Sequence, residues 1–192
     1  MTRLLSSWNY SKWIIETHLD NIEDYRSYIP NNNDNRTIET ATNNGYQHYF
    51  GDEIQPLAEI VRNRANSVLA EMQSPVRAGD LDKSWSIQYE KGGWQAMHNH
   101  ADPFTIISCI IYFDTNPSEN TSAGALYAML AEPDGSENVL VFPYWAGKMI
   151  MIEGNVFHGT YPTEDTRDIM VFDFKQEIIN DPNNEEVRLQ AN

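Results

Sequence analysis

The second half of the chain is a succession of short apolar segments, and this pattern restricts the possible fold most strongly. Trp85, Ile87 and Tyr89 alternate with polar residues, which is the spacing of a strand with one buried face. Gly92-Gly93 predicts a turn. Further strand-like runs lie near residues 94–101, 105–113, 124–130, 138–143, 147–153 and 168–175. Many short strands separated by turn-rich pieces predict a sandwich or barrel of the jelly-roll kind.

The first half of the chain is expected to support these strands. Apolar residues recur at helical spacing between Leu57 and Met72, after Pro56 and before Ser74-Pro75, and they predict an amphipathic helix. A second, short helix is predicted over 8–20, and the polar stretch 30–45 reads as a surface loop. We therefore expect one domain over 1–192. Its 1–83 portion would be mostly helical, and 84–175 would form the jelly-roll core.

Composition limits the classes of partner. The net charge of −15 argues against binding a phosphate backbone, so nucleic acid is an unlikely partner. No run approaches 18 apolar residues and no leader peptide is evident, which predicts a soluble cytoplasmic protein without a membrane span. The single cysteine, Cys109, lies in an apolar run and is expected to be a small buried residue. The oligomeric state is left open.

Potential metal ligands cluster immediately after the first strands. His98, His100 and Asp102 are spaced two residues apart, so an extended backbone directs all three to one face. His158 follows on a later strand-like segment, and Arg167 comes nine residues after it. A His-x-His pair also occurs by chance, and zinc could use the same ligands. The lone residues His18 and His48 are expected to serve surface or packing roles.

The order of residues around these ligands matches a known pattern. It runs through Tyr89, Gly92-Gly93, His98-Asn-His100-Ala-Asp102, Ile110-Ile-Tyr112-Phe-Asp, Ala123-Gly-Ala-Leu126, Phe142-Pro-Tyr-Trp-Ala-Gly147, His158 and Arg167. In this order the sequence resembles the 2-oxoglutarate- and Fe(II)-dependent dioxygenases, particularly the prolyl-4-hydroxylase-like group. The resemblance covers about residues 84–175.

The resemblance implies a double-stranded β-helix, a cupin-like jelly roll, and a hydroxylase that converts 2-oxoglutarate and O2 to succinate and CO2. His100, His158 and Arg167 would be the catalytic residues. Fe(II) would be held by three of the four residues His98, His100, Asp102 and His158. Arg167 and Tyr112 would bind the far carboxylate of 2-oxoglutarate, and Tyr89 would line the site near the metal.

Two registers of the paired ligands remain open. Counting forward from Tyr89 places the pair on His98 and His100, whereas counting back from Ser108 places it on His100 and Asp102. An anionic ligand helps to neutralise ferrous iron, which favours Asp102. A pair without a carboxylate would allow a halide ligand or a three-histidine centre like that of thiol dioxygenases.

Two other readings compete with the oxygenase. One is a cupin-like metalloenzyme that does not use 2-oxoglutarate, for which Arg167 and Tyr112 would have no anion to bind. The other is a non-catalytic jelly-roll binding module with its histidines packed in the core. The substrate of an oxygenase could be a small molecule or a protein side chain. Trp94, Tyr144 and Trp145 could line its groove, although aromatic residues in strands more often pack in a core.

Overall fold

The computed structural model describes residues 3–4, 13–30, 42–100, 106–118, 120–131 and 137–179. Two 3-10 helices and one α-helix lie in this part of the chain: η1 (Ile22–Tyr28), η2 (Asp52–Ile54) and α1 (Gln55–Glu71). The strands are β1 (Arg3–Leu4), β2 (Ile14–His18), β3 (Thr42–Tyr49), β4 (Val76–His98), β5 (Ile106–Tyr112), β6 (Leu126–Ala131), β7 (Glu137–Phe142), β8 (Lys148–Glu153), β9 (Phe157–Thr160) and β10 (Arg167–Ile178).

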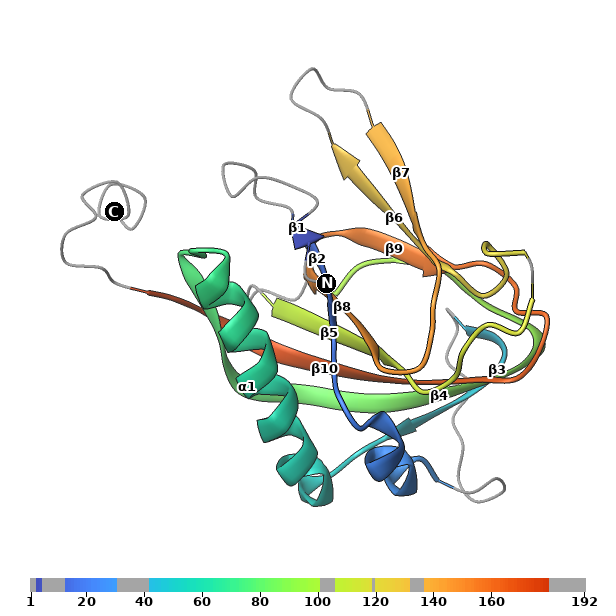
Figure 1. Ribbon diagram of the computed structural model, residues 1–192, viewed down its shortest axis with the longest axis horizontal. Helices are drawn as coiled ribbons and strands as arrows, with labels where there is room; N and C mark the ends of the chain where they lie inside the picture. The colour runs from blue at the N-terminus through green and yellow to red at the C-terminus, as the bar shows by residue number, and fades with distance from the viewer. Residues whose placement is uncertain are drawn as a thin grey trace.

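The described strands form one antiparallel sheet that curls into a half-barrel (Figure 1). The strand order is β1-β2-β8-β5-β10-β4-β9-β6-β7, and β3 pairs with β4 beside this path. The long strand β4 pairs with β10 along most of its length and with β9 at its end, where His98 lies opposite His158. This topology confirms the predicted jelly roll, and it brings the two histidine segments to one place.

Two apolar layers lie on opposite faces of the curled sheet. Leu57, Val61 and Val68 of α1 pack with Met170 and Phe172 of β10 on the outer face. On the inner face, Ile169 and Val171 of the same strand pack with Trp85 and Tyr112. Strand β5 is buried on both faces, which explains why its sequence is a continuous apolar run. Cys109 lies in β5 and is buried, as expected.

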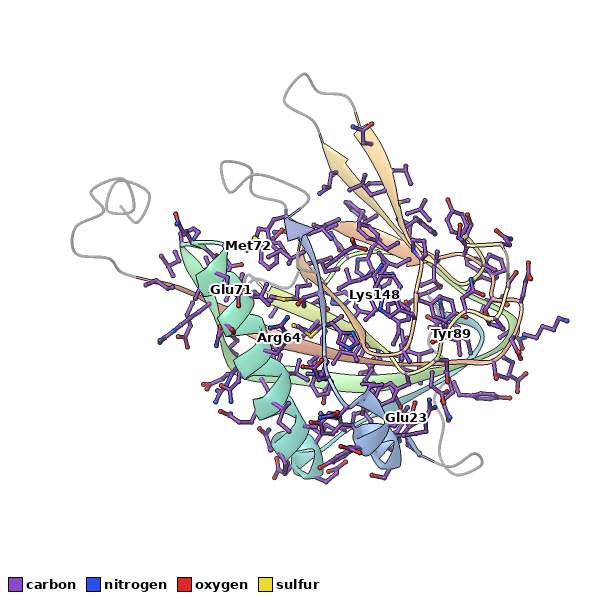
Figure 2. The ribbon with its side chains drawn as sticks, viewed as in Figure 1. Glu23, Arg64, Glu71, Met72, Tyr89 and Lys148 are labelled. Carbon is purple, nitrogen blue, oxygen red and sulfur yellow. The ribbon has the colours of Figure 1, made fainter. Side chains whose placement is uncertain are left out.

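The helix predicted between residues 57 and 72 is confirmed as α1, which lies across the outer face of β4 and β10 (Figure 1). Arg64 of α1 donates hydrogen bonds to Thr17 Oγ1 at 2.7 Å and to the carbonyl of His18 at 3.0 Å, and Figure 2 shows its place on the helix. These bonds hold the end of β2 against the helix. In the described residues, no helix has the length and hydropathy that a membrane span requires.

The N-terminal region is less helical than predicted. The short helix expected over 8–20 is wrong in its described part, because residues 14–18 form strand β2. Ile14 and Ile15 are both fully buried, one on each face of the sheet, and a strand between β1 and β8 provides those two environments. Residues 42–45 of the expected loop belong to β3, and 31–41 lie outside the described residues.

The turn predicted at Gly92-Gly93 is also wrong, because β4 continues through both residues. Gly92 has a φ of +83°, and a Cβ on Gly93 would lie 2.4 Å from the carbonyl oxygen of Asn44. The two glycines therefore permit a local irregularity and a close approach of β3 within a continuous strand.

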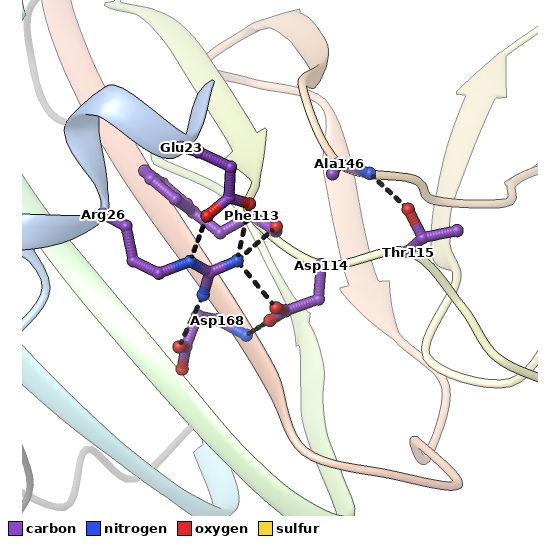
Figure 3. A network of polar contacts seen from close by, with 7 residues as sticks. All are labelled: Glu23, Arg26, Phe113, Asp114, Thr115, Ala146 and Asp168. Atoms are coloured by element: carbon purple, nitrogen blue, oxygen red, sulfur yellow. Dashed lines mark hydrogen bonds and ion pairs between the residues drawn. The ribbon is translucent and has the colours of Figure 1, made fainter. Parts of the chain in front are cut away.

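An ionic network fixes the start of β10 (Figure 3). The Arg26 guanidinium of η1 contacts Glu23 at 2.7 Å, Asp114 at 3.1 Å and Asp168 at 3.6 Å. It also donates to the carbonyl oxygen of Phe113, and the Asp168 amide donates to Asp114. The pKa of Arg26 is raised, chiefly by its hydrogen bond to Glu23. The network ties η1 to the residue that follows Arg167.

Candidate metal centre and anion site

Three histidines converge inside the curl of the sheet. His98 ends β4, His100 follows it, and His158 lies on β9. One ring nitrogen from each lies within 4.8 Å of the others, and the Nε2 atoms of His98 and His100 are 3.3 Å apart. His158 is buried and the His100 side chain is 6% exposed, whereas His98 is only partly buried. Solvent therefore approaches the cluster from the side of His98.

The hydrogen bonds of the Nδ1 atoms determine which nitrogens face the centre. Nδ1 of His98 lies 2.8 Å from the Ala96 carbonyl oxygen, and Nδ1 of His158 lies 2.9 Å from that of Val156. Nδ1 of His100 lies 3.0 Å from Asp173 Oδ1. Each acceptor requires a proton on Nδ1, so each neutral ring directs an Nε2 lone pair toward the cluster. Lone pairs 3.3 Å apart repel unless a cation lies between them, and a metal ion satisfies this arrangement.

Burial favours the neutral, metal-binding form of these rings. It is the main cause that lowers the pKa of His158 well below its ordinary value, and charge on His100 and His98 adds to the effect. Burial also lowers the pKa of His98, partly offset by the hydrogen bond to Ala96. A metal ligand must be deprotonated, so the site holds these two histidines in the required form near neutral pH.

Not every predicted ligand can be placed. Asp102 lies outside the described residues, and its part in the centre stays a prediction. The described residues bring together His98, His100 and His158, which is the register counted from Tyr89. His18 and His48 lie elsewhere: His18 is 3.6 Å from Asp20, and the His48 ring packs edge-on against Phe50.

Arg167 is a buried cation that forms no ion pair within the described residues. It opens β10, is 0% exposed, and none of its three guanidinium nitrogens has a hydrogen-bond partner in the described part of the chain. The guanidinium lies 4.3 Å from the ring centre of Tyr89, 5.3 Å from that of Tyr144 and 5.9 Å from that of Tyr112. Aromatic faces offset only part of the cost of burying a charge, so an anion beside the guanidinium would be stabilising.

Two neighbours shape the surroundings of Arg167. The buried hydroxyl of Tyr112 also lacks a partner in the described structure, and burial raises its pKa, so it remains a proton donor. Gly124 has a φ of +65°, and a Cβ there would lie 3.0 Å from Arg167 Nη1 and 2.9 Å from the Tyr144 ring. Only glycine leaves this space open. A hydroxyl and a guanidinium together can hold a carboxylate.

A narrow cavity of about 10 Å³ lies beside the three histidines. Its lining includes all three histidines together with Trp85, Gln95, Ile110, Leu126, Thr160, Ile169 and Val171. Gln95 accepts a hydrogen bond from the Tyr89 hydroxyl at 3.3 Å, and the Tyr89 ring lies against Arg167. Burial raises the pKa of Tyr89, although the positive charge of Arg167 opposes this. Tyr89 and Gln95 thus connect the histidine cluster to the anion site, and Figure 2 places Tyr89 within the curl of the sheet.

By sequence, the chain matches no family model and no curated protein. Its structure is similar to that of the non-haem alpha-ketoglutarate-dependent carbocyclase SnoK from nogalamycin biosynthesis. That match has a TM-score of 0.62 at 11% identity and covers 93% of this chain and 86% of SnoK. The epimerase SnoN of the same biosynthesis gives 0.61 at 15%, covering 84% of this chain and 78% of SnoN.

A prolyl hydroxylase from Trichoplax adhaerens, solved with a peptide of hypoxia-inducible factor, gives a TM-score of 0.52 at 15% identity. The match covers 77% of this chain and 66% of the hydroxylase. SnoN has also been solved with Fe3+, alpha-ketoglutarate and a nogalamycin compound, and this complex matches at a TM-score of 0.60 and 14% identity. It covers 86% of this chain and 80% of SnoN. The chain has the fold of the 2-oxoglutarate/Fe(II) oxygenases.

Within this oxygenase fold, the predicted elements are largely confirmed but some site residues were missed. Tyr144 was expected to line a groove or pack in the core; it is 3% exposed and stacks on Tyr112 beside Arg167. Trp94 and Trp145 are 37% and 44% exposed, so the core expectation is wrong for these two. Asp173 was not singled out, although a lone carboxylate in the apolar run Met170–Phe174 is an unusual and detectable signal.

Proposed function

We propose that the protein is an Fe(II)- and 2-oxoglutarate-dependent oxygenase, with hydroxylation as its reaction. The observation that carries this proposal is the buried, unpaired guanidinium of Arg167 on the same sheet face as three convergent histidines. The fold agrees with it, because the alpha-ketoglutarate-dependent enzymes SnoK and SnoN share that fold.

His98, His100 and His158 are the ligands that we propose for the metal, each through Nε2. Their Nδ1 hydrogen bonds to Ala96, Asp173 and Val156 fix the ring orientations before a metal arrives. The donor set fits Fe(II), which imidazole ligands suit. With 2-oxoglutarate, the iron supplies O2 activation and oxidation of a substrate C–H bond, giving succinate and CO2.

Arg167 and Tyr112 are the residues that we propose for the far carboxylate of 2-oxoglutarate. The anion would satisfy the unpaired guanidinium nitrogens and the Tyr112 hydroxyl together. The cavity of about 10 Å³ is smaller than this co-substrate. We therefore expect apolar wall residues such as Leu126 and Ile169 to shift when it binds.

The buried Arg167 and the three histidines also favour this proposal over a cupin-like enzyme without 2-oxoglutarate and over a non-catalytic jelly roll. A cupin-like enzyme without 2-oxoglutarate gives no reason to bury Arg167 away from every carboxylate of the described structure. A non-catalytic jelly roll gives no reason to aim three Nε2 lone pairs at one point. The substrate that we propose is a small molecule or a protein side chain. SnoN was solved with a nogalamycin compound and the Trichoplax enzyme with a peptide, so the shared fold does not choose between these classes.

The decisive test is an anaerobic titration of the metal-free protein with Fe(II) and then 2-oxoglutarate. We expect a weak visible metal-to-ligand charge-transfer band in the wild type. Arg167→Met should require a much higher 2-oxoglutarate concentration for the same band. If iron binds and no band forms at any 2-oxoglutarate concentration, the protein does not use this co-substrate.

A parallel titration tests the ligand register. We expect His98→Ala to bind Fe(II) far more weakly than the wild type, since Nε2 of His98 belongs to the convergent group. Asp102→Ala is the comparison variant. If the Asp102 substitution abolishes iron binding and the His98 substitution does not, the ligand pair is His100 and Asp102 instead.

A further inference from the structure

Asp173 is a buried carboxylate in direct contact with the histidine cluster. It lies on β10, is 0% exposed, and its Oδ1 is 3.0 Å from Nδ1 of His100. Its Oδ2 has no hydrogen-bond partner in the described structure. The ammonium group of Lys83, on the neighbouring strand, lies 3.8 Å from Oδ2, and the Lys83 side chain is 46% exposed. Solvent therefore weakens the attraction between Lys83 and the carboxylate without removing it, and His100 is the closer partner of Asp173.

Burying such a charge is costly unless another charge offsets it. A buried carboxylate loses much of its favourable hydration, which one hydrogen bond to a neutral ring does not restore. Ser108, directly opposite Asp173 on β5, is buried and polar, but its hydroxyl makes no hydrogen bond in the described structure. Apart from the half-exposed ammonium of Lys83, the nearest place for a compensating positive charge is the proposed metal position on the far side of His100.

The three histidines differ in what lies behind them. Backbone carbonyls accept from Nδ1 of His98 and of His158, whereas a carboxylate accepts from Nδ1 of His100. Within the described residues, Asp173 is the only carboxylate that contacts a member of the cluster. An anion behind an imidazole fixes its tautomer and raises the basicity of the opposite nitrogen.

Building on the metal centre proposed above, we propose that Asp173 is a positioning residue for the metal. It holds His100 with Nε2 toward the ion and supplies, through that ring, a negative charge that three neutral imidazoles lack. The enclosed charges then balance. Fe(II) and Arg167 carry three positive charges, and 2-oxoglutarate and Asp173 carry three negative charges.

The test is the affinity of the metal-free protein for Co(II), followed anaerobically by its visible absorption. Asp173→Asn keeps the size and an oxygen acceptor but removes the charge. We expect Co(II) binding to weaken about 10- to 100-fold, with a changed visible spectrum. The metal-free variant should have a thermal midpoint no lower than that of the wild type. Ser108→Ala, on the same face and opposite Asp173, is the matched control and should bind Co(II) like the wild type.

The outcomes separate this inference from the proposed function. If the wild type binds no Co(II), the metal centre itself is wrong. If the wild type binds Co(II) and Asp173→Asn binds it within twofold as tightly, only the role of Asp173 is wrong. If Asp173→Asn does not fold, Lys83→Met decides: removing the competing cation should tighten Co(II) binding about two- to fivefold, and unchanged or weaker binding overturns the inference.

Discussion

The two faces of β10 differ in how completely their side chains are satisfied. Met170, Phe172 and Phe174 point to the outer face, where they pack fully buried against other apolar residues beneath α1. Arg167 and Asp173 lie at the two ends of the inner face, which contains Ile169 and Val171 between them. Both charged residues are fully buried, and both have polar atoms without partners in the described structure.

This difference indicates that the outer face of β10 serves stability and its inner face serves binding. The outer face gains free energy by burying apolar surface, and it anchors the strand. The inner face loses free energy by burying charges, and the partners that we propose for them are the metal and the co-substrate. Substitutions on the outer face should therefore affect folding, whereas those on the inner face should affect binding.

The largest expected effect is on the outer face. Phe172→Ala should lower the free energy of unfolding by about 3–5 kcal/mol, because it leaves a cavity beneath α1. Urea unfolding of the metal-free protein measures this loss. The fraction that remains folded should bind Co(II) with unchanged affinity. A strong loss of metal affinity in folded Phe172→Ala protein would show that the two faces are not separable.

Arg167→Met is the inner-face counterpart. It removes a buried charge and keeps the apolar stem, so the free energy of unfolding should stay the same or rise. The affinity for 2-oxoglutarate should fall about 30-fold or more, since a charge-assisted pair is lost. Isothermal titration under anaerobic conditions, with Co(II) in the site, measures this change. A large loss of stability with intact 2-oxoglutarate binding would instead make Arg167 a structural residue.

The third expectation concerns pH and the inner face alone. The folded-state pKa of His158 is lowered, whereas the ordinary value of an unfolded histidine is about 6.5. Below about pH 6.5 the unfolded chain takes up a proton that folded His158 does not, so stability falls as the pH falls. The slope from this residue approaches about 1.4 kcal/mol per pH unit and disappears above about pH 7.

Urea unfolding of the metal-free protein between pH 5 and 8 measures this slope. His158→Gln is the comparison variant and should show a shallower dependence on pH in the acidic range. Equal slopes for the two proteins would contradict the neutral, buried state of His158. Excess Co(II) should stabilise the wild type at neutral pH and lose its effect on acidification, because protons and metal compete for Nε2.

Period-two alternation and apolar runs were sufficient to predict most strands from β4 onward, because most of these strands are buried on at least one face. The same signal failed at residues 14–18, where the aromatic and charged neighbours of Ile14 and Ile15 suggested a helix. The strand at this segment is determined by the pairing of β2 with β8, and pairing between residues 130 to 138 positions apart leaves no local pattern in the sequence.

The site shows the same limit. The spacing of His98 and His100 and the position of Arg167 were evident from the sequence, because His98 and Arg167 lie on strands and His100 directly follows the strand that His98 ends. Asp173 was not singled out, and Tyr144 was expected only to line a groove or pack in the core, since the places of both beside the site depend on what the curled sheet brings together. The sequence shows that a residue is polar, but the fold determines which residues lie beside that residue across the sheet.

The smallest expected effect is at Gly124. Gly92 is its matched control and separates the loss of stability due to backbone strain from the loss of 2-oxoglutarate binding. Both have positive φ, so an alanine at either position should cost about 1 kcal/mol of stability through backbone strain. A Cβ at Gly92 has nothing within 4 Å, whereas one at Gly124 meets Arg167 and Tyr144.

Gly124→Ala should therefore weaken 2-oxoglutarate binding about fivefold or more through overpacking, and Gly92→Ala should leave it unchanged. Thermal unfolding and anaerobic titration of the two variants side by side make the comparison. Equal 2-oxoglutarate affinity in both would mean that Arg167 moves aside freely. The anion site would then be defined by the rings of Tyr89 and Tyr112 and not by the space that Gly124 leaves.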